Sequence, residues 1–188
     1  MSLSIRKITF FTFLKLPSVF WLGIRVKSMD HQSCSVAVRH RWITQNPFKS
    51  LFWAVQGMAA ELSTGAMVMS CIRASKKNIS MLVANNKATF YKKATGKITF
   101  TCNDGKLIEQ TIKDAVLSGE GKTCWMKSEG LNEDGILVSV FEFEWTASLW
   151  VPAAGALTGA LLAWIAGWWG LAEVLRQPVS QTLRQASE

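Results

Sequence analysis

The chain has 188 residues, of which 49% are hydrophobic, and a formal net charge of +8 at pH 7. This length favours a single domain with enough mass to bury a substantial core. The lysines occur singly or in pairs, without interleaved aromatic residues or a nucleic-acid-binding motif, so the composition argues against a nucleic-acid-binding protein.

The excess positive charge lies in residues 1–146, because residues 147–188 contain two arginines and two glutamates. A basic domain attracts phosphorylated ligands or anionic lipids. Lys15 interrupts the apolar run near the N-terminus and no cleavage site follows it, so we expect no signal peptide. The cysteines are widely spaced, which predicts no metal site but reduced, mostly buried thiols in a cytosolic protein. They are Cys34, Cys71, Cys102 and Cys124.

The first third of the chain predicts a helix and a strand. Residues 5–16 have the pattern of a short amphipathic helix that ends before Pro17, and residues 19–26 are mostly apolar with a turn at Gly23. Residues 35–42 then alternate in polarity, which predicts a strand with one buried face. The residues on that face are Val36, Val38, His40 and Trp42.

A long apolar helix is predicted over residues 48–72. Between residues 48 and 69 the only charged side chains are Lys49, at the start, and Glu61, near the middle. A helix that is apolar on every side is meant to be buried. A carboxylate inside such a helix costs several kcal/mol unless it is paired, hydrogen-bonded or protonated. Glu61 therefore requires an explanation.

The residues around Glu61 predict a site beside it. Trp53, Gly57, Glu61 and Gly65 recur every four residues and share one face of the helix. The glycines leave space next to the carboxylate, so Gly57, Met58 and Gly65 are candidate substrate contacts and Glu61 is a candidate reactive group. The alternative is a structural carboxylate that caps a neighbouring backbone group.

The remaining segments predict a mainly antiparallel sheet. Residues 81–92 and 97–103 have the pattern of a hairpin with a turn at residues 94–96, and residues 107–116 have that of a short helix. Residues 123–128 and 136–145 predict a second hairpin around the turn at residues 132–135. One long buried helix followed by antiparallel strands is typical of an α+β domain whose sheet wraps around that helix.

Two motifs carry a resemblance to a known family. Asn46-Pro47-Phe48 precedes Glu61, which lies fifteen positions after Asn46, and residues 90–96 lead into the alternating residues 98–102. This order and spacing resemble the hot-dog thioesterase superfamily, most closely its PaaI-like branch and related domains of unknown function. The resemblance covers about residues 10–146.

The resemblance implies a curved antiparallel sheet around the helix and a homodimer, or alternatively a tetramer, with active sites at the dimer interface. Glu61 would be the general base or nucleophile, and Asn46 would position substrate or water across the interface. The backbone N–H groups of Phe52, Trp53 and Ala54 would polarise the thioester carbonyl. The implied substrate is a fatty or aromatic acyl thioester of coenzyme A or acyl carrier protein, and no cofactor is implied.

The sequence departs from the family pattern where the helix begins. Phe52-Trp53-Ala54 replaces the His-Gly-Gly-type turn of the family. Bulky side chains there favour an alternative function, a catalytically silent protein that binds acyl groups or acyl-CoA. Lys92 and Lys93 are candidates for contact with the phosphates of coenzyme A, and a solvated strand end is the alternative for them.

Residues 149–172 form a run of 24 uncharged residues that, as a helix, would extend about 36 Å and could cross a bilayer. The nearest basic residues follow the run, so the positive-inside rule would place residues 1–146 outside the cytosol. Three interpretations of residues 147–188 therefore remain: a membrane tether, a helix packed on the domain or its dimer partner, and a fused or frame-shifted extension. A tether would make the chain a membrane-anchored interaction protein.

Overall fold

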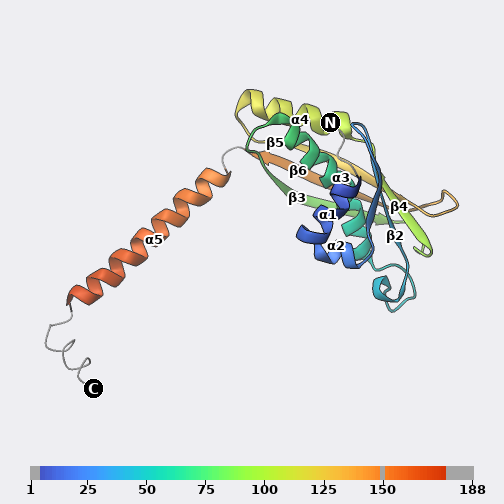
Figure 1. Cartoon of the computed structure of the whole chain (residues 1–188), viewed down its shortest axis with the longest axis horizontal. Coiled ribbons are helices and arrows are strands. Elements are labelled where there is room, and N and C mark those ends of the chain that lie inside the picture. Colours follow the sequence, from blue (N-terminus) through green and yellow to red (C-terminus); the bar gives the residue numbers. More distant parts are fainter. Residues whose placement is uncertain (1–4, 149–150, 177–188) are drawn as a thin grey trace, which may run out of the picture. The chain divides into compact units, whose positions relative to one another are not determined.

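The computed structural model describes residues 5–148 and 151–176, with side chains for residues 5–147 and 157–169. Figure 1 shows an α+β arrangement, as the sequence predicts. The elements in chain order are α1 (Ile5–Lys15), α2 (Pro17–Trp21), β1 (Arg25–Met29), β2 (Cys34–Arg39), η1 (Trp42–Thr44), α3 (Trp53–Ser75), β3 (Ser80–Phe90), β4 (Lys97–Cys102), α4 (Gly105–Ser118), β5 (Lys122–Leu131), β6 (Leu137–Ser148) and α5 (Val151–Arg176).

The chain divides into two compact units, residues 1–149 and residues 150–188. The second unit contains the additional C-terminal helix, α5, which has 26 residues. Among the described residues, no helix is both long and apolar enough to cross a membrane. A membrane tether is one of three interpretations of the run at residues 149–172, and residues 149–150 of that run lie outside the described residues.

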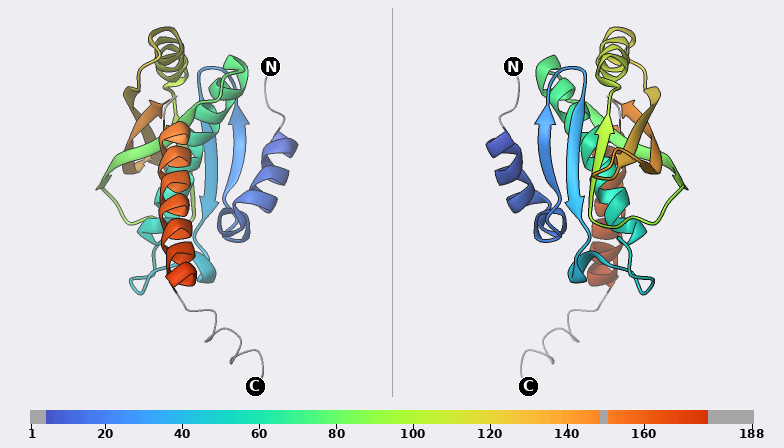
Figure 2. Two further views of the ribbon diagram at one scale, coloured as in Figure 1. Left: turned by 90° about the vertical axis from the view of Figure 1, so that its left-hand side faces the viewer. Right: turned by 90° about the vertical axis from the view of Figure 1, so that its right-hand side faces the viewer.

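The first unit is built on one six-stranded sheet in the order β1-β2-β4-β5-β6-β3, in which every pair is antiparallel. α3 packs against one face of the sheet, and Figure 2 shows it running beside the strands. The core between them is apolar, because α3 and the strands turn their apolar side chains toward each other. Its fully buried side chains include Leu51, Met67, Val68, Ile98, Phe100 and Met126.

Five sequence predictions are confirmed in this unit. The helices expected at residues 5–16 and 107–116 are present as α1 and α4, and the hairpin around residues 132–135 is present as β5 and β6. All four cysteines are free thiols, and three of them are buried. The central helix also packs inside the sheet, as expected from its apolar length.

The predicted start of the central helix at residue 48 is wrong, because α3 begins at Trp53. The Asn46 side chain accepts hydrogen bonds from the backbone N–H groups of Phe48 (3.0 Å) and Ser50 (3.2 Å). The N–H of Leu51 then donates to Ala94 O at 2.8 Å. These bonds hold residues 46–51 in a loop, since a polar side chain that satisfies nearby amides competes with helix formation.

The hairpin predicted between residues 81–92 and 97–103 is also wrong. Both strands exist, but β3 pairs with β6, whereas β4 pairs with β2 and β5. The alternation of polarity identifies a strand and its buried face, but not the strand beside it. The twelve-residue β6 is long enough to pair with β3 on one side and β5 on the other.

The strand predicted over residues 35–42 is shorter than expected, because β2 ends at Arg39. Thr44 causes this end: its hydroxyl accepts from Arg41 N–H at 2.8 Å and donates to Arg39 O at 2.9 Å. Trp42 consequently lies in η1, where it is 84% exposed instead of buried. His40, predicted to face the core, is half-buried.

Two sets of buried hydrogen bonds, at Gln56 and at Ser63, hold α3 against its surroundings. Gln56 donates from Nε2 to Leu51 O at 3.0 Å and accepts at Oε1 from the Ser139 hydroxyl of β6 at 2.9 Å. Two turns later, the hydroxyls of Ser63 and Ser128 are 2.8 Å apart. Because buried polar groups are costly when unsatisfied, these bonds favour the observed placement of α3 on the sheet.

We predict that Gln56→Leu lowers the free energy of unfolding by about 2 to 4 kcal/mol, because Leu51 O and the Ser139 hydroxyl each lose a partner in the core. Chemical denaturation measures the loss. The control is Gln110→Leu, whose side chain bonds Asp114 on the surface of α4 and should change stability by less than about 0.5 kcal/mol. Equal effects of the two substitutions would show that the Gln56 contacts do not stabilise the fold.

Candidate functional site

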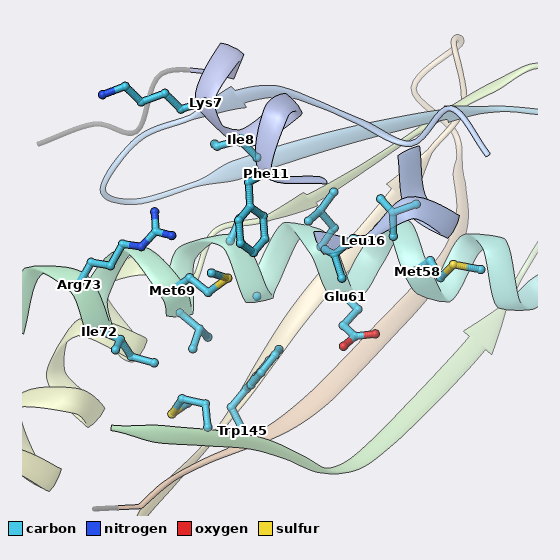
Figure 3. A pocket seen from close by; sticks show the side chains of 16 residues that line it. Lys7, Ile8, Phe11, Leu16, Met58, Glu61, Met69, Ile72, Arg73 and Trp145 are labelled. Atoms are coloured by element: carbon cyan, nitrogen blue, oxygen red, sulfur yellow. The ribbon is translucent and has the colours of Figure 1, made fainter. Parts of the chain in front are cut away.

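A pocket of about 410 Å³ lies between α3, the two N-terminal helices and the strands β3 and β6. Figure 3 shows its side chains around the middle of α3. Most of them are apolar, and the charged exceptions are Lys7, Glu61 and Arg73. The pocket is lined by Lys7, Ile8 and Phe11 of α1, Leu16 and Val19 at α2, Met81 of β3, Trp145 of β6, and Met58, Glu61, Leu62, Gly65, Ala66, Val68, Met69, Ile72 and Arg73 of α3.

One stripe of α3 supplies more than half of this lining. Its residues recur at intervals of three or four, so they lie on one side of the helix. Met58, Glu61 and Gly65, which the sequence predicted as site residues, belong to this stripe. Gly57 does not line the pocket, because it faces β6: a Cβ there would lie 3.5 Å from Phe141 Cε1.

The Glu61 carboxylate differs from the predicted fully buried group, because its side chain is exposed to solvent at the pocket. In the part of the chain that the structure describes, it makes no hydrogen bond or ion pair, so it caps no backbone group there. The surrounding apolar side chains nevertheless raise the pKa of Glu61 by desolvation. It is an unpaired acid at the edge of an apolar cavity.

Trp145 forms the wall of the pocket beside Glu61. Its indole Nε1 donates to the Thr64 hydroxyl at 3.2 Å, and that hydroxyl donates to Glu61 O at 3.0 Å. Gly65 lies against this ring, since a Cβ there would lie 3.4 Å from Trp145 Cη2, in ordinary van der Waals contact. The space predicted beside the glycines is therefore occupied in part by an aromatic ring, and the cavity extends toward α1 instead.

Asn46 lies in the loop before α3 and does not line the pocket. Besides the two backbone amides, its Oδ1 accepts from the Ser50 hydroxyl at 3.2 Å. Within this subunit its side-chain oxygen therefore organises the loop. The structure does not bring Asn46 and Glu61 of one chain together in the pocket.

Of the three backbone amides predicted to stabilise the oxyanion, that of Phe52 is not available. The N–H of Phe52 donates to Thr44 O at 2.8 Å and is already used. The amides of Trp53 and Ala54 lie in the first turn of α3, where a helix provides no backbone acceptor. Trp53 is eight residues before Glu61, which separates them by about 12 Å along the helix. None of these three residues lines the pocket.

Lys92 and Lys93 are exposed and lie in the link between β3 and β4. The neighbouring Ala94 accepts the hydrogen bond from Leu51 N–H, so this link lies against the loop before α3. The structure thus brings Lys92 and Lys93 near the loop of Asn46 and not to the pocket of Glu61. Among the described residues, His40 Nε2 is buried without a hydrogen-bond partner, and His40 does not line this pocket either.

The sequence analysis missed the cationic residues of the pocket, Lys7 and Arg73, and its aromatic walls, Phe11 and Trp145. Arg73 could have been found, because it continues the stripe that contains Glu61. The other three come from α1 and β6, and no pattern in the sequence states that these elements meet α3. The Arg73 guanidinium lies 5.9 Å from the centre of the Phe11 ring.

A second cavity, of about 940 Å³, lies between the C-terminal half of α3 and α4 and shares Lys7 and Arg73 with the first. It contains Cys71 and the surface ion pair of Lys113 with Glu109, at 2.7 Å. Across the described ranges of the chain, no group of three His, Cys, Asp or Glu side chains comes together that could hold a metal ion.

The first unit matches a family of known sequences. A family model described as a domain of unknown function (DUF4442) matches residues 6–148. No curated protein sequence matches the chain.

Solved structures resemble this chain at low sequence identity. A protein of unknown function from Pseudomonas aeruginosa, described as a probable thioesterase, has a TM-score of 0.69 and 18% identity over 79% of this chain and 97% of its own. A protein of unknown function from Chlorobaculum tepidum has a TM-score of 0.66 and 14% identity over 76% and 93%. A thioesterase from Haemophilus influenzae has a TM-score of 0.59 and 14% identity over 78% and 92%. At this identity the likeness shows the fold alone.

The raised pKa of Glu61 predicts a pH-dependent stability. Because the folded state binds the Glu61 proton more tightly than the unfolded state does, ionising this group lowers the free energy of unfolding. The penalty is absent below the ordinary glutamate pKa of about 4.3 and grows as the pH rises through the raised value. Glu61→Gln should therefore be more stable than the parent at pH 7, and this advantage should disappear toward pH 4.

Thermal unfolding at both pH values measures the difference. Glu142→Gln is the matched control, because Glu142 is an exposed carboxylate on β6 outside the pocket. If Glu61→Gln destabilises the protein at pH 7, the carboxylate has a stabilising partner and the desolvation argument fails.

Proposed function

The chain belongs to the DUF4442 family and has the hot-dog fold of the thioesterase superfamily, and on this premise we propose that it hydrolyses acyl thioesters with Glu61 as general base. The substrate class is a fatty or aromatic acyl group carried as a thioester. The observation that supports the proposal is the unpaired Glu61 carboxylate at the edge of an apolar pocket.

The pocket has the size and chemistry for an uncharged acyl group. Its volume of about 410 Å³ lies in the range of small-molecule sites, which are mostly apolar with a few polar groups. Met58, Met69 and Met81 line it, and their flexible thioethers adapt to irregular apolar ligands. A thioester carbonyl next to Glu61 would thus have its acyl chain among apolar side chains.

The chemistry requires one proton transfer and one carbonyl attack. Glu61 takes a proton from water, and the oxygen of that water bonds to the thioester carbon. Collapse of the tetrahedral intermediate breaks the carbon–sulfur bond, and the thiolate leaves and is protonated, which yields a carboxylic acid and a thiol. A desolvated carboxylate suits this role, because its raised pKa makes it a stronger base near neutral pH. Direct attack by the carboxylate is the alternative route.

A second subunit would complete the site. Within one subunit, Asn46 and the first-turn amides of α3 lie outside the pocket that contains Glu61. In a homodimer, these groups of one subunit could approach Glu61 of the other, where the amides would stabilise the oxyanion with the partial positive charge of a helix N-terminus. β3 favours such an assembly, because it is an edge strand whose residues 84–90 are all exposed.

The carrier of the acyl group would be coenzyme A or an acyl carrier protein, both of which present phosphate. The exposed Lys92 and Lys93 beside the loop of Asn46 are the proposed phosphate contacts. A cytosolic location fits this substrate and the four free thiols, which persist in reducing compartments.

We predict that the purified protein hydrolyses at least one acyl-CoA and that Glu61→Ala lowers kcat/KM by about 10²- to 10⁴-fold, the usual contribution of a general base. A panel of acyl-CoA thioesters with a thiol-detecting reagent measures the rates. Glu142→Ala, which removes an exposed carboxylate outside the pocket, should leave the rate unchanged. Retention of full activity in Glu61→Ala would exclude the proposed mechanism.

The phosphate contacts give a separate prediction. Replacing Lys92 and Lys93 with alanine should raise KM for acyl-CoA about tenfold with kcat unchanged, because a charge-assisted hydrogen bond contributes about 1.5 kcal/mol to binding of ground and transition states alike. A truncated thioester without the nucleotide should show no such change. Equal KM increases for both substrates would argue against a phosphate contact.

The start of α3 supports a second candidate, a protein that binds acyl thioesters without hydrolysing them. The Phe52 amide is already bonded, and the Phe52 and Trp53 side chains are 41% and 59% exposed where the family pattern has His and Gly. Retention of a thioester by the purified protein without release of thiol would select this function.

A further inference from the structure

α1 has apolar side chains on both of its sides. Ile8 and Thr12 face the domain and are 7% and 2% exposed. Phe10 and Leu14 face outward and are 64% and 56% exposed. A surface helix needs only one apolar side to pack on its own domain, so the outward side requires another explanation.

The outward apolar side continues from α1 onto α2. The rings of Phe13 and Phe20 meet edge to face with centroids 5.0 Å apart, and Phe20 contacts Trp21 at 5.9 Å in the same way. Trp21 is 70% exposed. We name this surface the N-terminal apolar face, and its residues are Phe10, Phe13, Leu14 and Trp21.

The segment that carries the N-terminal apolar face is basic. Arg6 lies one turn before Phe10 on the same side of α1, and Lys7 lies next to it at the edge of the pocket. Residues 5–29 contain five basic residues and no acidic residue. The five are Arg6, Lys7, Lys15, Arg25 and Lys27.

This combination selects one kind of partner. Aromatic and leucine side chains next to lysine and arginine are typical of helices that lie in the interface of an anionic bilayer. A second copy of the same face is disfavoured, because a two-fold contact would bring basic side chains of the two copies together, and residues 5–29 supply no acidic side chain to pair with them. The exposed indole of Trp21 also suits the interface, where its ring is apolar and its N–H remains hydrated.

We propose that the N-terminal apolar face docks the protein on the surface of anionic lipid bilayers, with Phe10, Phe13, Leu14 and Trp21 inserted among the lipids and the basic residues at the headgroups. The docking surface and the pocket share α1, because Lys7, Ile8 and Phe11 line the pocket. Docking therefore places the acyl pocket one helix away from the membrane. This surface does not depend on the proposed hydrolysis, and its test measures binding alone.

The test compares full-length variants by co-sedimentation with phosphatidylcholine vesicles that contain or lack phosphatidylglycerol. The full-length parent should bind the anionic vesicles at least about tenfold more tightly than the neutral ones. Phe10→Ser with Leu14→Ser should weaken binding to anionic vesicles at least about tenfold. Phe48→Ser with Leu117→Ser is the matched control, because these side chains are 78% and 84% exposed elsewhere and should leave binding unchanged.

A charge-reversed pair separates the contribution of the basic residues. Arg6→Glu with Lys15→Glu should lower binding to anionic vesicles, whereas Lys77→Glu with Lys106→Glu, which gives the same net charge at other exposed positions, should lower it much less.

The proposal is overturned by any of three results: no preference of the parent for anionic vesicles, equal binding by the Phe10/Leu14 variant and its control, or loss of a dimer in light scattering caused by the Phe10/Leu14 variant. The last result would assign the face to a second copy.

Discussion

The placement of α3 against the sheet depends on a few buried polar contacts that apolar packing could not replace. Apolar side chains alone would allow the helix to slide or rotate, since hydrophobic attraction has no direction. Gln56 removes that freedom by bonding Leu51 O before the helix and Ser139 on β6. Thr64 adds a second fixed point through Trp145. The position of Glu61, between these two points, follows from them.

The same contacts explain how a carboxylate is tolerated on an apolar helix. Glu61 lies on the side of α3 that faces the pocket, whereas Gln56 and Ser63 are buried on the sides that face the sheet and are satisfied there. The carboxylate keeps access to water and loses only part of its hydration, which is enough to raise its pKa. The fold therefore accommodates an unpaired acid at a moderate cost, and the proposed catalysis would draw on that acid's basicity.

Local sequence patterns predicted the helices and strands of this protein better than they predicted which strands pair with each other. The stripe of α3 with Glu61 and Gly65 was visible in the spacing of residues, and so were β5, β6 and α4. Pairing was not visible: the partner of β3 is β6, because strand order depends on contacts across the whole sheet. The start of α3 was predicted five residues too early for a different reason. The Asn46 side chain accepts hydrogen bonds from the amides of Phe48 and Ser50, and these bonds hold in a loop a segment whose apolar pattern predicts a helix.

β6 carries two of the contacts that position α3. Ser139 and Trp145 are six residues apart, and the residues between them alternate so that Phe141 and Phe143 also face inward. Adding or deleting one residue between them would turn one of the two away from the helix, because neighbouring side chains in a strand point to opposite faces. Changes in length should therefore be tolerated in the turn before β6 but not within it. In relatives of this chain, the number of residues between these two positions should vary less than the residues themselves.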